Sequence, residues 1–271
     1  MLPIGLNPSY DTMNTLPLCL VTRVLERGGP SSKGVWRCVC RAWNDILNLH
    51  TNVYISQYVR SIPLLQWVRA NGCPPWNEQT CLRAAENGHL EILQWLRAQG
   101  CPWDEWTCTF AAERGHLNIL QWARTNGCEW SNRTCFVAAE NGHLEVLQWA
   151  RANGCPWDSW TCTKAAENGH LEVLQWARVN GCPWDEDTCA YAALNGHLEV
   201  LQWARANGCP WDEDTCAYAT FNGHFEVLQW AHANGCPWDA GTCENAFDNG
   251  HLHILQWARD NGCPCYEWTV S

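Results

Sequence analysis

The chain has 271 residues, of which 19 are Cys and 20 are Trp but only 5 are Phe and 6 are Tyr. Its 17 Lys and Arg against 28 Asp and Glu give a net charge of −11, which repels phosphate backbones and anionic lipid and argues against nucleic-acid or membrane-surface binding as the main activity. Because Trp outnumbers Phe and Tyr together, the composition indicates that one sequence unit is copied along the chain.

The first thirty residues contain no basic stretch followed by a long apolar run, and nowhere do 18 apolar residues occur together. We therefore expect neither a signal peptide nor a membrane span. This predicts a cytoplasmic or nuclear protein, in a compartment where thiols stay reduced. A disulfide scaffold is not needed, because a chain of this length can bury a sizeable core.

Residues 1–50 do not share the pattern of the rest of the chain and are predicted to form a separate helical segment. Leu16-Pro17 opens it, and Val39-Cys40-Arg41-Ala42-Trp43 follows about twenty residues later. This segment resembles an F-box, which typically begins with Leu-Pro and carries a Val-Cys-Arg-x-Trp motif. The resemblance implies docking to the Skp adaptor of an SCF-type ubiquitin ligase, with the docking surface or its support formed by Leu16, Pro17, Leu20, Val24, Leu25, Val39 and Trp43.

The middle of this segment departs from the F-box pattern. The string GGPSSKG replaces the usual Leu-rich and Asp-Leu stretch, and the total length is slightly short. The alternative is that the same apolar residues only cap the domain that follows.

Residues 51–271 are predicted to form that domain, beginning with an irregular helix pair. TNVYISQYVRS is its candidate first helix and IPLLQWVRANG its second, with Pro63 near the helix start, where its missing N–H costs nothing. Seven regular copies of a 27-residue unit follow. The Gly-His dipeptide marks them at residues 88, 115, 142, 169, 196, 223 and 250.

Each copy contains two short helix signals, as in the unit that starts at Asp185. The first helix is predicted to begin at Thr188 and to end at Asn195-Gly196, and the second to run from about His197 to Asn207. Leu198, Leu201 and Ala204, with Val200 and Trp203, give the second helix a broad apolar face. A pair this short cannot bury that face alone, so the copies must stack into an all-α solenoid.

The string Thr-x-x-x-Ala-Ala-x-x-Gly-His-Leu-Glu-Val-Leu resembles an ankyrin repeat, and the match covers roughly residues 51 to 265. Two departures are that Cys replaces the Pro of the Thr-Pro step and that the period is 27 rather than 33. The missing residues predict that the projecting hairpin of an ankyrin array is trimmed to a tight Cys-Pro-Trp-Asp turn, in which the Trp plugs the gap. A leucine-rich repeat is disfavoured, because its Leu ladder is absent.

Positions that vary between copies are free of the demands of stacking and are candidates for binding. The resemblance to ankyrin repeats implies that the turn and first helix line the concave side, where partners usually bind. Aromatic anchors surrounded by charges are typical of binding hot spots. We call the resulting set of candidate residues the first-helix strip: Trp106, Phe110, Arg133, Val137, Trp160, Lys164, Asp187, Tyr191, Leu194, Asp214, Tyr218 and Phe221.

The repeated Cys and His residues predict no metal site, no cofactor and no enzyme activity. Each copy supplies Cys-x6-Cys-x7-His, whereas structural zinc sites pair ligands two to four residues apart and need a fourth ligand. Near-identical copies leave no copy with a distinct catalytic role. Disulfides between successive copies are disfavoured by the spacing of stacked helices, so buried Cys is expected to act as a small hydrophobe. The Gly-His histidines are expected at the start of each second helix, bonded to the backbone of a neighbour.

Together the two resemblances imply a monomeric, non-enzymatic adaptor that docks a ligase through residues 14–48 and binds a protein substrate through its repeats. This combination is similar to proteins of large DNA viruses that redirect host ubiquitination, and the Trp- and Cys-rich unit to viral and algal arrays. The alternative is a repeat scaffold that sequesters a partner without recruiting a ligase. At the far end, CPCYEWTVS begins another turn and breaks off, which leaves the last face poorly covered.

Overall fold

The structure is a computed structural model that describes residues 61–70 and 76–265. The chain divides into two compact units, residues 1–54 with 67–74 and residues 55–66 with 75–271. The F-box-like segment, its seven candidate docking residues and the domain boundary predicted at residue 50 lie outside the described residues. Within them no helix is long and apolar enough to cross a membrane.

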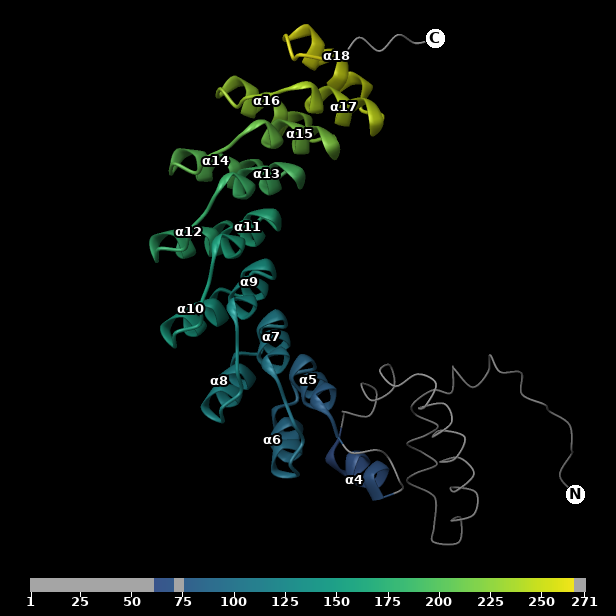
Figure 1. Cartoon of the computed structure of the whole chain (residues 1–271), viewed down its shortest axis with the longest axis vertical. Coiled ribbons are helices and arrows are strands. Elements are labelled where there is room, and N and C mark those ends of the chain that lie inside the picture. The colour runs from purple at the N-terminus through teal and green to yellow at the C-terminus, as the bar shows by residue number, and fades with distance from the viewer. Residues whose placement is uncertain (1–60, 71–75, 266–271) are drawn as a thin grey trace, which may run out of the picture. The chain divides into compact units, whose positions relative to one another are not determined.

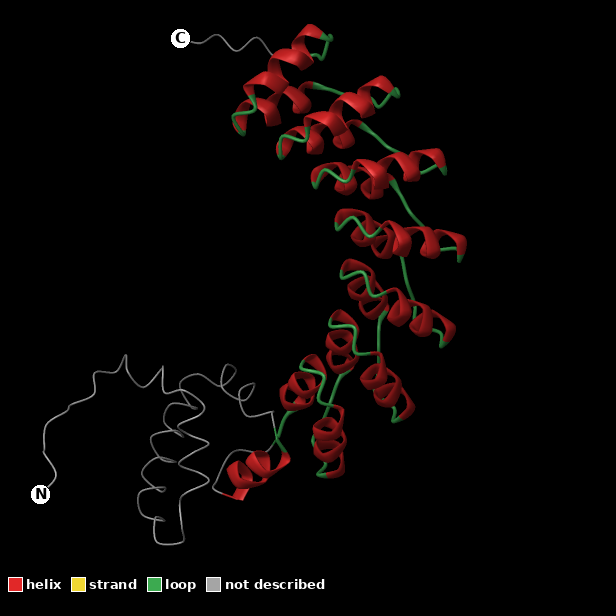
Figure 2. Cartoon of the chain, turned by 180° about the vertical axis from the view of Figure 1, so that it is seen from behind, coloured by secondary structure: helices red, strands yellow, loops and turns green. Residues whose placement is uncertain are grey.

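The second unit is a row of helix pairs, and no strand occurs among the residues that are described (Figures 1 and 2). The irregular start contributes α4 (Ile62–Ala70), which confirms the predicted second helix of that pair. The first helices of the regular pairs are α5 (Glu78–Glu86), α7 (Glu105–Glu113), α9 (Asn132–Glu140), α11 (Ser159–Glu167), α13 (Glu186–Leu194), α15 (Glu213–Phe221) and α17 (Ala240–Asp248). The second helices are α6 (Leu90–Ala98), α8 (Leu117–Thr125), α10 (Leu144–Ala152), α12 (Leu171–Val179), α14 (Leu198–Ala206), α16 (Phe225–Ala233) and α18 (Leu252–Asp260).

The predicted start of the first helix is wrong by two residues. In α13 the N-cap is Asp185, whose extended backbone (φ −142°, ψ −172°) precedes a helix that already begins at Glu186. Thr188 therefore lies in the first turn, where its N–H donates to the Asp185 carbonyl at 3.1 Å and its side chain is fully buried. The acidic residues before Thr188 were the true start signal, since Asp is as good an N-cap as Thr.

The helix ends agree with the sequence. Asn195 is the C-cap of α13, and Gly196 follows with φ +75°, a left-handed conformation that costs glycine little. The second helix α14 begins and ends within a residue of the prediction, with His197 and Asn207 as its caps.

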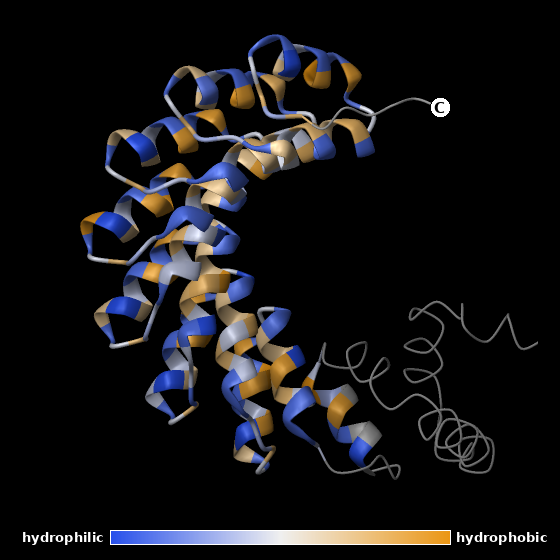
Figure 3. Ribbon diagram, turned by 45° about the horizontal axis from the view of Figure 1, so that its top comes forward, coloured by the Kyte–Doolittle hydropathy of each residue, from blue (hydrophilic) through white to orange (hydrophobic). Residues whose placement is uncertain are grey.

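Successive pairs stack through one continuous apolar core, as predicted. Val200, Leu201 and Ala204 of α14 are buried, and the equivalent residues of the other second helices join the same cluster. Each helix carries both hydrophilic and hydrophobic residues (Figure 3). The first helices of successive pairs pack against one another on the inner side of the bend, while the second helices fan out on the outer side (Figure 1).

The Gly-His histidine links neighbouring helix pairs at several repeats, where its predicted place and role are confirmed. His170 is the N-cap of α12, and its Nε2 lies 3.1 Å from the carbonyl oxygen of Glu140 at the end of α9. Because a carbonyl only accepts, this contact requires the Nε2 proton. The same bond joins His116 to Glu86 and His143 to Glu113.

The two cysteines of each unit are buried neighbours and hold the turn to the first helix. Cys182 donates its thiol to the carbonyl oxygen of Asp158, the N-cap of α11, at 3.4 Å. Hydrogen bonding to Cys182 and burial raise the pKa of the Cys162 thiol. A thiol in this setting is unreactive, so these pairs behave as the small hydrophobes that the sequence predicts.

The turn tryptophans bridge successive second helices on the outer side. Trp184 lies under the guanidinium of Arg178, 3.9 Å from ring centroid to Cζ, and contacts Trp203 of the next second helix edge to face at 5.9 Å. The same Arg–Trp–Trp bridge recurs at Trp103, Trp130, Trp157 and Trp211. At Trp238 the ring of His232 takes the place of arginine, stacked at 3.8 Å. Trimming of the hairpin is thus confirmed, and the Trp fills the space between helices.

Candidate functional site

The first-helix strip lies entirely on α7, α9, α11, α13 and α15, the helices of the inner side. The helical repeat places residues three and four apart on one face, and stacking brings equivalent faces of adjacent first helices side by side. The strip is therefore one continuous surface whose composition changes from repeat to repeat.

A chain of aromatic side chains forms the centre of the strip. Trp160 of α11 contacts Tyr191 of α13 edge to face with ring centroids 6.1 Å apart, and Tyr191 contacts Tyr218 of α15 in the same manner at 5.9 Å. Trp160 is 45% exposed, and the two tyrosines are half-buried. Three neighbouring repeats thus present one ridge of aromatic rings.

A second aromatic group lies on α7 and α9. Trp106 and Phe110 are in contact at 6.1 Å, and the guanidinium of Arg133 lies 4.8 Å from the Trp106 ring centroid and 5.7 Å from that of Phe136. Arg133 is exposed and has no carboxylate partner among the described side chains. Its positive charge is available to a ligand.

Between these two groups is a cavity of about 290 Å³. Its mixed lining of amide, carboxylate, cationic and aromatic side chains comes from Asn132, Arg133, Phe136, Asp158, Trp160 and Lys164. Asn132 donates to an Asp158 carboxylate oxygen at 2.6 Å and so ties α9 to the cap of α11. The cavity is of a size to accept one side chain of a partner.

Lys164 is committed to internal ion pairs. Its Nζ lies 2.6 Å from a Glu167 carboxylate oxygen and 3.7 Å from one of Glu140 on the preceding repeat. Burial opposes the charged form, but the hydrogen bond to Glu167 and the charges of Glu167 and Glu140 raise the pKa of Lys164. It therefore contributes more to repeat stacking than Arg133 does.

The strip becomes acidic towards α15. Burial and the charges of Asp185, Glu186 and Asp214 raise the pKa of Asp187, and burial with Asp214, Tyr191 and Asp187 raises that of Tyr218. Both shifts have neighbouring acidic groups among their causes, so negative charge gathers at this end of the strip. A cationic group would be stabilised here by the carboxylates and by the faces of the tyrosine rings.

One predicted member of the strip is placed wrongly. Val137 is 5% exposed and belongs to the core, so it is not available to a partner. It occupies the same position as Phe110 and Lys164, whose longer side chains reach past the neighbouring helices. Phe136 instead lines the cavity, and the signal was an aromatic residue at a position where no other copy carries one.

The remaining predicted residues lie along the strip but in different settings. Asp214 is exposed, Leu194 is half-buried at the end of α13, and Phe221 is 47% exposed at the end of α15. The Leu194 carbonyl accepts a hydrogen bond from Asn222 at 2.7 Å, which links the ends of these two helices. Phe221 therefore marks an exposed apolar edge of the acidic part.

A family model described as ankyrin repeats (many copies) matches residues 81–124 and 135–178. These two segments are therefore similar to ankyrin repeats. The human ASB11 ankyrin repeat domain, known from a crystal structure, is similar at 16% sequence identity, covering 58% of this chain and 84% of that chain with a TM-score of 0.49. A comparison with curated proteins finds no match.

Ankyrin repeats are a protein–protein interaction scaffold and typically non-catalytic. The described cysteines are mostly buried thiols of the repeats, but Cys243 and Cys265 form a disulfide. The expectation that disulfides between successive copies are disfavoured therefore does not hold at this end of the array. Cys265 lies outside the repeated Thr-Cys and Gly-Cys positions.

Proposed function

We propose that the chain is a protein-interaction adaptor whose first-helix strip binds a protein partner. The observation that carries this proposal is the aromatic ridge of exposed Trp160 and half-buried Tyr191 and Tyr218, which three successive repeats build together. Buried core positions repeat almost unchanged, whereas this ridge is built from positions that differ between copies. Aromatic side chains in a setting of charges are the residues that dominate binding energy at interfaces.

The charges along the strip constrain the partner. Arg133 and the adjoining cavity favour an acidic or amide side chain, while Asp187 and Asp214 favour a basic one. A partner that crosses the strip from α9 to α15 would therefore present acidic residues at one end and Lys or Arg at the other. Such complementarity contributes mainly to specificity and association rate.

Affinity capture from the native cell tests the binding face. The strip variant combines Trp160→Ala with Tyr218→Ala, and the matched control combines Glu199→Ala with Gln202→Ala, which are exposed on the second helix α14. We expect the strip variant to lose a protein that both the native chain and the control retain. Retention by the strip variant with loss in the control would place the binding face on the second helices instead.

The finer proposal is that the adaptor recruits an SCF-type ubiquitin ligase, with the bound protein as its substrate. It is supported by the F-box-like pattern of residues 1–50, from Leu16-Pro17 to Trp43. We expect the full chain to bind recombinant Skp adaptor and Trp43→Ala to bind it more weakly. If the full chain does not bind and Trp43→Ala behaves identically, the ligase role is excluded and the sequestering scaffold remains. Equal binding by both chains would remove only Trp43 from the docking surface.

A second experiment separates these two roles in the cell. The full chain and a chain that lacks residues 14–48 are compared for partner capture and for the abundance of the captured partner. A ligase adaptor predicts that the deletion preserves capture but restores partner abundance. A scaffold that acts by occupancy predicts that the deletion changes neither.

A further inference from the structure

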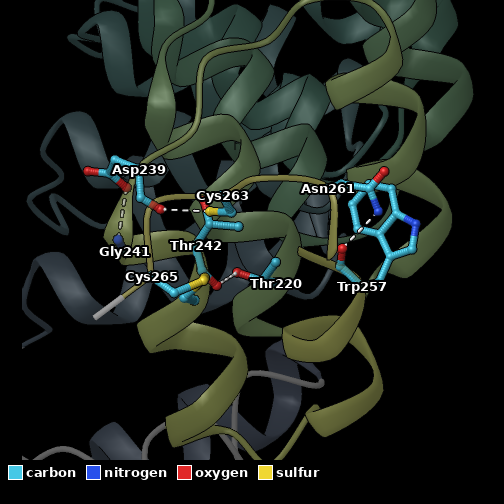
Figure 4. The surroundings of a disulfide bond; sticks show 9 residues. Thr220, Asp239, Gly241, Thr242, Trp257, Asn261, Cys263 and Cys265 are labelled. Atoms are coloured by element: carbon cyan, nitrogen blue, oxygen red, sulfur yellow. Dashed lines mark hydrogen bonds between the residues drawn. A yellow bond between two sulfur atoms is a disulfide. The ribbon is translucent and has the colours of Figure 1, made fainter. Parts of the chain in front are cut away.

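Three cysteines that hold different positions in the sequence meet at the last described repeat. Cys243 is the Thr-Cys residue of α17, Cys263 is the Gly-Cys residue after α18, and Cys265 comes two residues later. Their sulfur atoms lie within 4.8 Å of one another, and Cys243 is bonded to Cys265 (Figure 4). No other group of three Cys, His, Asp or Glu side chains within residues 61–70 and 76–265 comes as close.

Cys265 has no counterpart in the preceding repeats. The turn reads Cys-Pro-Cys here, whereas Cys-Pro-Trp stands in five earlier turns and Trp occupies the third position in every turn from Trp103 to Trp238. The six preceding repeats therefore contain the same pair of neighbouring thiols without a third sulfur. These repeats therefore serve as internal controls for the effect of the third cysteine, Cys265.

The scaffold around the three sulfurs is held by specific hydrogen bonds (Figure 4). The Cys263 thiol donates to the Asp239 carbonyl at 3.2 Å, and the Asp239 carboxylate caps α17 by accepting from the Gly241 N–H at 2.9 Å. The Cys265 N–H donates to the Cys263 carbonyl at 2.8 Å, a tight turn that returns the third sulfur towards the other two. Cys243 is fully buried and Cys263 is 7% exposed, so water has little access to them.

We propose that Cys243, Cys263 and Cys265, once reduced, form a binding site for a soft metal ion, Cu(I) or Zn²⁺, and that the disulfide is the oxidised form of this site. Three thiolates without oxygen ligands favour such soft or borderline ions over Mg²⁺ or Ca²⁺. Sulfur ligands about 2.3 Å from zinc lie roughly 3.8 Å apart. Reduction must therefore let the bonded Cys243 and Cys265 sulfurs separate, while the Cys263 sulfur already lies within 4.8 Å of both. Cu(I) is satisfied by three thiolates, whereas Zn²⁺ takes a fourth ligand from solvent.

A dithiol reductant transfers two electrons and two protons to the Cys243–Cys265 bond and becomes a disulfide itself. The metal ion then replaces the protons of the three thiols, which pass to solvent. Oxidation reverses the sequence by releasing the ion as Cys243 and Cys265 rejoin, with an oxidised dithiol as electron acceptor.

Metal titration of the full, reduced chain under anaerobic conditions tests the proposal. Zn²⁺ is titrated against a chromophoric chelator, Cu(I) against a copper(I) chelator, and Cd²⁺ serves as a probe through its sulfur-to-metal absorption band. We expect one tightly bound ion, with affinity reduced by about 100-fold or more in Cys265→Trp, which restores the residue of the other turns. Cys209→Ser, which alters a repeat pair, is the matched control and is expected to keep the native affinity and stoichiometry.

Two further measurements keep the result independent of folding and of partner binding. Circular dichroism verifies that Cys265→Trp is as helical as the native chain, and metal is expected to raise the thermal midpoint of the native chain alone. Equal metal binding by the native chain and Cys265→Trp would overturn the proposal. So would a reduced chain that binds no metal and simply reforms the Cys243–Cys265 disulfide.

Discussion

Trp184 on the outer side and Trp160 on the inner side show how the same residue type takes opposite roles in one repeat array. Trp184 lies between Arg178 and Trp203, an arrangement that recurs in repeat after repeat. Trp160 is 45% exposed, contacts Tyr191 and stands at a position that varies between copies. A residue that is the same in successive copies serves stacking, whereas a residue that varies between copies is free to bind a partner.

The largest expected effect comes from breaking the outer bridge. Trp184→Ala removes the contacts to Arg178 and Trp203 and should lower the free energy of unfolding by about 3 kcal/mol. Trp160→Ala removes the same side chain from the strip and should cost less than about 1 kcal/mol. Urea unfolding followed by far-ultraviolet circular dichroism measures both, and equal losses would remove the distinction between the two sides.

The next largest effect is expected where the His224 ring packs against the preceding repeat, and substitution of two glycines tests this contact. A Cβ on Gly196 would lie 2.6 Å from the His224 ring, whereas one on Gly208 would meet nothing, and both residues have positive φ. Gly208→Ala should cost about 1 kcal/mol from backbone strain alone, and Gly196→Ala about 2 kcal/mol or more. Indistinguishable losses in urea unfolding would mean that the histidine does not fix the repeat spacing.

A smaller effect is expected from pH. Burial lowers the pKa of His197, helped by the charges of His224 and His170, although its bond to the Glu167 carbonyl opposes the shift. A lowered pKa means that the folded chain disfavours the charged ring, so stability is complete above about pH 6.5 and is lost as the pH falls through the lowered pKa.

Unfolding midpoints between pH 7.5 and 5 should therefore decrease, and His197→Gln should weaken this dependence because its amide still donates but does not titrate. A midpoint that rises on acidification in this range would contradict the assignment.

The smallest expected effect lies on the first-helix strip, where the pH dependence of stability has the opposite sign to that at His197. The pKa of Asp187 is raised by burial and by Asp185, Glu186 and Asp214, so its contribution to stability is present below about pH 3.9 and is lost as the pH rises. At neutral pH Asp187→Asn should slightly raise the thermal midpoint, less so at high salt, while weakening partner capture. A lowered midpoint would assign Asp187 to the scaffold rather than to binding.

Helix boundaries were largely predictable because every repeat carries the same residues at the ends of its helices. Asn195-Gly196 and Gly208 ended the helices where predicted, since a left-handed residue after a helix is a local requirement. Thr188 was mistaken for the cap because both Asp185 and Thr188 suit that position, and only backbone hydrogen bonding distinguishes them.

The position of the candidate site was predictable from the sequence, but which of its residues are exposed was not. Variation between copies located Trp160, Tyr191 and Tyr218, which the structure joins into one ridge. It could not tell that Val137 is covered while Phe136 reaches the cavity, because adjacent helix positions differ in exposure according to the size of their neighbours.

The sequence by itself determined the repeat, its two helices and the residues that every copy needs. Helix propensity, caps and stacking surfaces are encoded locally, and the same signals recur in all seven copies. Only the tertiary structure decided which sulfur atoms meet. Cys243 and Cys265 are 22 residues apart and belong to different patterns, yet the fold places their Cα atoms 5.5 Å apart. Long-range proximity depends on how two helices and a turn pack, and no local pattern carries that information.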